Sequence, residues 1–160
     1  MADSLHQQLL NAIEARLKTI RAGQTVTVNG ESYVYKTDVG RHVFVRLKRQ
    51  LNPAIDFPCV DIIDDIDRIE YDGAPFGWQN NYLKITADCF TTGKAADLDG
   101  RKAYADIAAC VGSDFRWGGL ARHSSMAANP EDIAVEVAGN IICGTRVSFV
   151  VMYRSKQWQV

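Results

Sequence analysis

Three aspartates, Asp61, Asp65 and Asp67, are the side chains of this sequence best suited to chemistry. They alternate along a stretch that reads as a β-strand, so their carboxylates can converge on one face of a sheet. Clustered carboxylates are the ligands that hard cations such as Mg²⁺ prefer. The pattern is compatible with a metal-dependent phosphoryl-transfer enzyme or a structural divalent ion. A solvated strand face without metal is the simpler interpretation, and we expect that one.

Other motifs of catalysis are incomplete. The run Thr92-Gly93-Lys94-Ala95 resembles the end of a phosphate-binding loop, but Asp88 stands where its first glycine belongs. Ala95 replaces the hydroxyl residue that would meet magnesium. Each histidine stands outside a recognisable catalytic or zinc motif; the three are His6, His42 and His123. We therefore expect no catalytic residues, no cofactor and no enzymatic activity.

The charges are unevenly distributed along the chain. Residues 1–50 carry a net charge of +4, residues 51–100 carry −7 and residues 101–160 carry +2. A cluster at 41–49 is basic, but its only close aromatic residue is Phe44, so it lacks the stacking pair typical of nucleic-acid modules. A nucleic-acid-binding module remains an alternative, and solvated loops or a protein interface are favoured.

The basic segment 41–49 and the acidic segment 56–72 are candidates for opposite sides of a contact between copies of the chain. Two tryptophans in or beside loops join the candidate interface, because aromatic residues are enriched at interfaces. The complete candidate set is Arg41, Arg46, Lys48, Arg49, Asp64, Asp65, Asp67, Trp78 and Trp117.

The composition bounds the class of protein. With 160 residues, 47% hydrophobic and 23% charged, the sequence predicts one globular domain over 1–160. The cysteines lie in apolar runs without a C-x-x-C pair, which favours buried, reduced thiols; they are Cys59, Cys89, Cys110 and Cys143. No run approaches the ~20 apolar residues of a membrane span, so we expect no membrane partner and a reducing cytoplasm.

In the first half of the chain, the elements that would position these residues begin with a helix over roughly 5–21, capped by Ser4. Asn29-Gly30 between two β-rich runs predicts a hairpin over 24–36. A strand is expected near 42–48. Another begins at Phe57 and continues to about residue 71, with an irregularity at Ile62-Ile63.

The second half predicts a strand over 81–90 and then a helix capped by Asp97 and ended by Gly112. Residues 121–130 are small and polar, and we expect a mobile loop there. Strands follow near 133–137 and 145–153. The predicted fold class is α+β, with a mixed or antiparallel sheet, two helices packed on one face and a β-hairpin.

Five pieces of this pattern, in this order, resemble the phage tail-terminator family of the lambda-like minor tail protein U type. Together they cover the first helix and most of the chain from Phe57 on. The pieces are Leu5-x-x-x-Leu9-Leu10-x-x-Ile13-x-x-x-Leu17, Asp56-Phe57-Pro58-Cys59-Val60, Leu83-Lys84-Ile85-Thr86-Ala87-Asp88, Ala105-Asp106-Ile107-Ala108 and Val147-Ser148-Phe149-Val150-Val151-Met152-Tyr153.

The resemblance implies a structural virion protein without catalytic residues. Such proteins form a hexameric ring on the last ring of the tail tube, stop its growth and provide the surface to which the filled head attaches. The implied partners are other copies of the chain, the tail tube protein and a head-completion or connector protein, with DNA only passing through the ring. The implied place is the virion tail, assembled in the host cytoplasm. Another neck or tail-completion protein is the alternative.

Overall fold

The computed structural model describes residues 3–71, 77–91, 96–137 and 139–156. The helices are α1 (Leu5–Leu17), α2 (Pro53–Asp56) and α3 (Ala96–Ser113), with short 3₁₀ turns η1 (Val39–Arg41) and η2 (Trp117–Gly119). The strands are β1 (Thr25–Val28), β2 (Glu31–Val34), β3 (His42–Val45), β4 (Cys59–Tyr71), β5 (Trp78–Phe90), β6 (His123–Met126), β7 (Glu131–Val137) and β8 (Asn140–Lys156).

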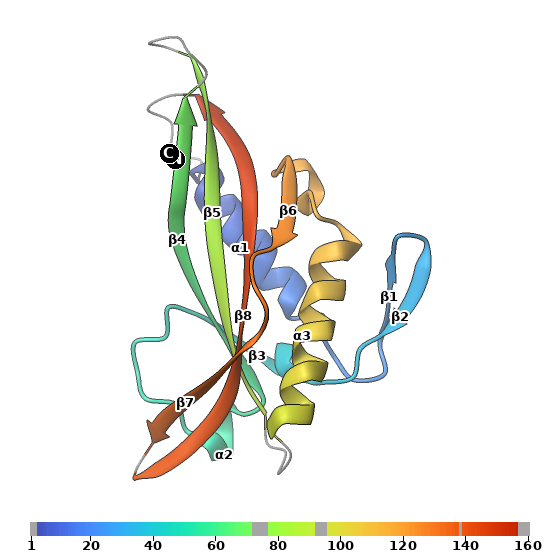
Figure 1. Cartoon of the computed structure of the whole chain (residues 1–160), viewed down its shortest axis with the longest axis vertical. Coiled ribbons are helices and arrows are strands. Elements are labelled where there is room, and N and C mark those ends of the chain that lie inside the picture. Colours follow the sequence, from blue (N-terminus) through green and yellow to red (C-terminus); the bar gives the residue numbers. More distant parts are fainter. Residues whose placement is uncertain (1–2, 72–76, 92–95, 138, 157–160) are drawn as a thin grey trace.

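A six-stranded mixed sheet forms the centre of the molecule, in the order β3-β4-β5-β8-β6, and β7 also pairs with β8. The β3–β4 pair is parallel, and every other described pair is antiparallel. β8 is long enough to pair with β6 through Phe149–Met152 and with β7 through Asn140–Arg146 along the same side. The strands β4, β5 and β8 extend past the helices at one end of the molecule (Figure 1).

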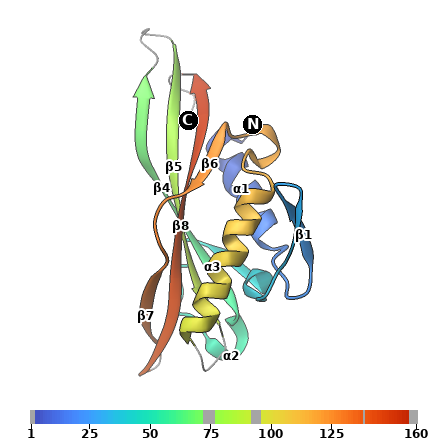
Figure 2. The same cartoon turned by 45° about the vertical axis from the view of Figure 1, so that its right-hand side comes forward.

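Helices α1 and α3 cover one face of this sheet (Figure 2). The sequence alternation explains the contact, because every second residue of β5 and β8 points toward the helices. Leu83 and Ile85 of β5 are fully buried there, as are Phe149 and Val151 of β8. The predicted α+β fold, with two helices on one face and a separate hairpin, is confirmed.

A second, smaller core lies on the other face of the sheet. Phe57 and Phe90 stack there with ring centroids 5.5 Å apart. Leu51 and Cys59 complete the buried part of the cluster, and Phe44 and side chains of β7 pack against it. The segment between β3 and β4 is thereby held against the sheet.

The hairpin β1–β2 turns at Asn29 and Gly30, which have φ values of 50° and 82°. Both left-handed conformations are those required by a type I′ turn, so this prediction is confirmed. The segment after the hairpin is fastened to α3 by Asp106, whose side chain is completely buried. That carboxylate accepts hydrogen bonds from Tyr33 Oη at 2.9 Å, from Thr37 N at 2.7 Å and from Thr37 Oγ1 at 2.6 Å.

Four local predictions are wrong. Helix α3 begins at Ala96 and ends at Ser113, so Asp97 lies inside its first turn and Gly112 inside its last. The β4 irregularity falls between Ile66 and Arg68, because Ile62 is buried under the helices while Ile63 points to the other face and keeps the alternation regular. The fourth wrong prediction is the mobile loop at residues 121–130, because these residues contain strand β6.

Strand β6 is held in place by two hydrogen bonds of the Ser124 side chain. Its hydroxyl donates to the Phe115 carbonyl oxygen at 2.8 Å and accepts from Trp117 Nε1 at 2.8 Å. The run Thr92-Gly93-Lys94-Ala95, which resembles the end of a phosphate-binding loop, lies outside the described residues.

Candidate functional site

The basic segment 41–49 and the acidic segment 56–72 form ion pairs with each other within the same chain. Arg46 Nε lies 2.7 Å from Asp64 Oδ1, and the same guanidinium also donates to the Asp64 carbonyl oxygen. His6 Nε2 lies 3.0 Å from Asp64 Oδ2. Burial raises the pKa of the Asp64 carboxyl, but the hydrogen bonds from Arg46 and His6 outweigh burial, and the net effect is a lowered pKa. Asp64 thus ties α1, β3 and β4 together.

A second internal ion pair joins Arg49 to Asp56 at the end of α2. The two terminal guanidinium nitrogens of Arg49 donate to the Asp56 carboxylate at 2.6 and 2.7 Å, and the Asn52 backbone N–H donates to it at 2.7 Å. The Asp56 side chain is buried although Arg49 is half exposed. The bidentate contact of Arg49, followed by the Asn52 N–H, lowers the pKa of Asp56 from 3.8 to about 2.

This pairing predicts a specific loss of stability in acid. Because the folded-state pKa of Asp56 lies below its unfolded value, its contribution is complete above about pH 5 and disappears as the pH falls toward 2. Urea unfolding of the parent and of Asp56→Asn is therefore expected to give a difference in unfolding free energy that shrinks from pH 6 to pH 2.5. In the Arg49→Gln background the pH dependence should be much weaker. An equal difference at all pH values would contradict the assignment.

The rest of the expected interface set divides between surface and core. Arg41, Lys48, Asp65 and Asp67 are exposed. Trp78 is 45% exposed at the start of β5. Trp117, by contrast, is 1% exposed and stacks on Phe149 with ring centroids 6.0 Å apart. Its bulk belongs to the core, and Arg16 covers it at 4.6 Å from the ring centroid.

The aspartates of β4 lie in different surroundings. The Asp61 carboxylate accepts the Leu47 N–H at 3.0 Å, and burial raises its pKa. Its neighbour across the strand pair, Asp88, is held by Arg146 at 2.7 and 2.8 Å. The register of β4 against β5 shifts between Ile66 and Arg68, so Asp67 stands at the irregularity and has no partner residue on β5. Within the described ranges, no three His, Cys, Asp or Glu side chains are grouped as metal ligands.

Three of the four cysteines are buried, as the sequence predicts; Cys143 is exposed. Burial raises the pKa of the Cys59 and Cys110 thiols to about 12 and also raises that of Cys89. At neutral pH these three sulfurs are protonated and therefore weak nucleophiles.

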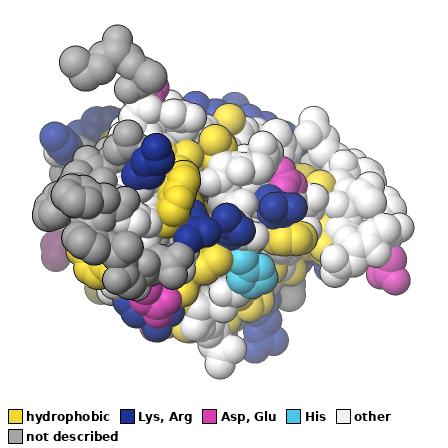
Figure 3. All heavy atoms as spheres, turned by 90° about the horizontal axis from the view of Figure 1, so that it is seen from above, with side chains coloured by type: hydrophobic (Ala, Val, Ile, Leu, Met, Phe, Trp, Pro, Cys, Tyr) yellow, Lys and Arg dark blue, Asp and Glu magenta, His cyan; other side chains and the backbone are white. Residues whose placement is uncertain are grey.

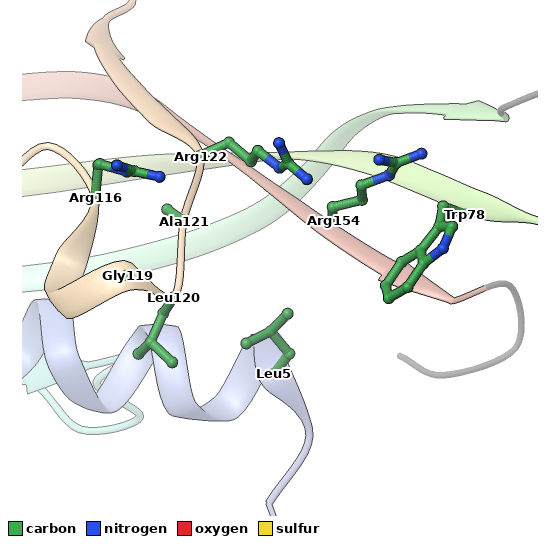
Figure 4. Close-up of a pocket in the computed structure, with 8 residues that line it drawn as sticks. All are labelled: Leu5, Trp78, Arg116, Gly119, Leu120, Ala121, Arg122 and Arg154. Carbon is green, nitrogen blue, oxygen red and sulfur yellow. The ribbon is translucent and has the colours of Figure 1, made fainter.

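A cavity of about 630 Å³ lies beside β8. It is lined by Leu5, Trp78, Arg116, Gly119, Leu120, Ala121, Arg122 and Arg154. The three arginines lie along one side, Leu5 and Leu120 along the other, and Trp78 at one end (Figure 4). Seen from above, Lys and Arg side chains gather beside apolar ones at this end of the molecule (Figure 3). We call this the arginine pocket.

Several elements build the arginine pocket. Arg116 precedes η2, whose Gly118 and Gly119 adopt φ values of 70° and 91°. The Arg122 backbone N–H donates to the Met152 carbonyl oxygen at 2.8 Å, and this bond fixes the position of Arg122 along β8. The Arg154 guanidinium carbon lies 5.4 Å from the Trp78 ring centroid.

Among the described residues that line the arginine pocket, none is acidic, so its lining combines the positive charge of three arginines with the aromatic ring of Trp78. The sequence gives no local signal for it. Arg122 lies within the segment 121–130 that was expected to be a mobile loop, Arg116 lies shortly before it, and Arg154 comes from β8.

No known protein family matches this chain. Likewise, no significant match emerges among curated proteins. None of the described helices combines the length and apolar character needed to cross a bilayer.

Proposed function

We propose that this chain is a structural phage protein that forms a ring, expected to be a hexamer, on the end of a tail tube. The ring stops growth of the tube and offers the surface to which the filled head is joined. Its partners are other copies of the chain, the tail tube protein and a head-completion or connector protein.

One observation carries the proposal. Four of the pieces on which the family resemblance rests lie in α1, β5, α3 and β8, and these elements share one continuous core. The fifth piece begins just before β4; its Val60 belongs to the same core, whereas its Phe57 and Cys59 lie in the smaller core on the other face. Leu9 and Ile13 of α1 and Ile107 of α3 are fully buried in the same cluster as Ile85 of β5 and Phe149 of β8. The packing of these pieces in one three-dimensional unit supports the proposal.

The charged surface also supports assembly over catalysis. A closed ring of identical copies needs a heterologous contact, in which two different surfaces of the chain meet. The chain has such surfaces of opposite sign, since Asp65 and Asp67 are exposed on β4 while three arginines line the pocket beside β8. The internal pairing of Arg46 and Arg49 removes them from the free basic surface and leaves Arg41 and Lys48 there.

Electron microscopy tests the proposal directly. The purified chain mixed with tail tubes is expected to form rings with six-fold symmetry at one end of each tube, and tubes so capped should not elongate when tube protein is added. A matched sample without the chain should elongate. Binding along the sides of tubes, or no binding at all, would contradict the proposal. Binding to the connector but not to tubes would favour the alternative of a neck protein.

A further inference from the structure

Among the described strands, none pairs with the outer edge of β4 over much of its length. Strand β3 pairs with β4 only through Cys59–Ile62, and the Arg46 side chain caps the edge at Asp64. Beyond that point no described strand covers residues 65–71, which we call the β4 edge. Exposed edges of this kind present backbone donors and acceptors to a further strand.

The β4 edge is acidic and partly apolar. Asp65 and Asp67 are exposed, and in the described parts of the chain neither forms an ion pair. Ile69 is 38% exposed and Tyr71 63%. The charge of Arg68 is already paired within the chain. Its Nε lies 3.2 Å from Glu70 Oε1, and its guanidinium carbon lies 4.1 Å from the Tyr82 ring centroid.

The opposite edge is basic. Strand β6 pairs with β8 only as far as Met152, so residues 153–156, the β8 edge, have no described partner strand on that side. Arg154 and Lys156 lie on this edge, and the arginine pocket opens beside it with Arg116 and Arg122. Within the described residues, neither Arg116 nor Arg122 forms an ion pair.

The two edges also agree in direction and level. β4 and β8 are both antiparallel to β5, so they run in the same direction. Arg68 is level with Tyr82, and Tyr82 is level with Met152, whose carbonyl accepts the Arg122 N–H. A second copy placed alongside without a shift along the strands would therefore bring Ile69 level with Arg122 and place Asp67 within two residues of that level.

From these observations we infer that the arginine pocket and the β8 edge receive the β4 edge of a second copy of this chain, in a parallel, head-to-tail contact. Asp65 and Asp67 of one copy meet the arginines of the next, and exposed apolar groups such as Ile69 and Trp78 become covered. The contact is heterologous, so it can close into a ring. The inference rests on the proposed function and specifies the contact that the ring would use.

Paired charge reversals test this contact. One variant carries Arg122→Glu and Lys156→Glu, and the other carries Asp65→Lys and Asp67→Lys. The matched control carries Arg41→Glu and Lys48→Glu, on exposed basic residues outside both edges. Analytical ultracentrifugation measures association, and circular dichroism verifies that each variant is folded.

The parent is expected to associate beyond a dimer, and each edge variant alone should associate about 100-fold more weakly, because like charges then face each other. An equimolar mixture of the two edge variants should regain association, since their reversed edges are again complementary. The control should associate as the parent does. These three results together support the inference.

Other results overturn it. A parent that stays monomeric at about 1 mM, edge variants that associate normally, or a mixture that fails to recover would each exclude this contact. So would loss of association in the control alone. Tripolyphosphate binding that depends on Arg122 but leaves association unaffected would make the pocket a small-anion site. If the edge variants behave as expected but the parent does not cap tail tubes, the contact stands and the proposed function fails.

Discussion

Asp106→Ala is expected to lower the free energy of unfolding by about 3 kcal/mol, because it leaves buried and partly buried hydrogen-bond donors without an acceptor. The affected donors are the Thr37 N–H and hydroxyl, the Lys36 N–H and the Tyr33 hydroxyl. Urea unfolding at neutral pH measures the loss. Amide hydrogen exchange should also become faster at Lys36 and Thr37, where the segment after β2 is released from α3.

The control for this substitution is Asp99→Ala on the same helix. Asp99 is partly exposed and lies 3.8 Å from Lys102, so its removal should change the unfolding free energy by no more than about 0.5 kcal/mol. If Asp106→Ala costs as little as Asp99→Ala, or if the exchange rates at Lys36 and Thr37 do not change, the carboxylate does not hold the hairpin segment to α3.

Gly40→Ala is expected to cost at least about 2 kcal/mol, because the added methyl group would enter backbone and not a movable side chain. A Cβ at Gly40 would press on the Leu17 carbonyl oxygen and lie 2.7 Å from that of Ile20. The turn η1 would have to move away from the end of α1, taking Val39 out of the core, where it is fully buried. Thermal and urea unfolding measure the loss.

Gly112→Ala is the matched control, since it adds the same methyl group inside α3. There the nearest atom is Val28 Cγ1 at 3.1 Å, at the end of a side chain that can adjust. The gain in helix propensity, about 1 kcal/mol, offsets this contact. A Gly40→Ala protein as stable as Gly112→Ala would show that η1 is free to shift.

The parts of the fold that follow from local pattern could be predicted from the sequence. Asn29-Gly30 fixes the hairpin because few residue pairs accept positive φ at two successive positions. The alternation of Leu83, Ile85 and Ala87 gives both the strand and its buried face, and the periodic leucines of α1 give its helix.

The features that were missed depend on distant partners. Strand β6 has the sequence His-Ser-Ser-Met, which shows no alternation of apolar and polar residues, and it becomes a strand because β8 pairs with it and Trp117 donates a hydrogen bond to Ser124. The burial of Trp117 depends in the same way on Phe149 and Arg16. Charge counts along the chain also did not reveal that Arg46 and Arg49 are paired with Asp64 and Asp56.

The pairing of β8 with three strands has a consequence for synthesis. β5, β6 and β7 all precede β8 in the chain, and each pairs with it. During translation, the β4–β5 hairpin can form early, but one side of β5 stays without a partner until β8 has left the ribosome. We expect this interval to be the time of greatest vulnerability to aggregation, and slower translation of the codons for β8 to lower the yield of folded protein.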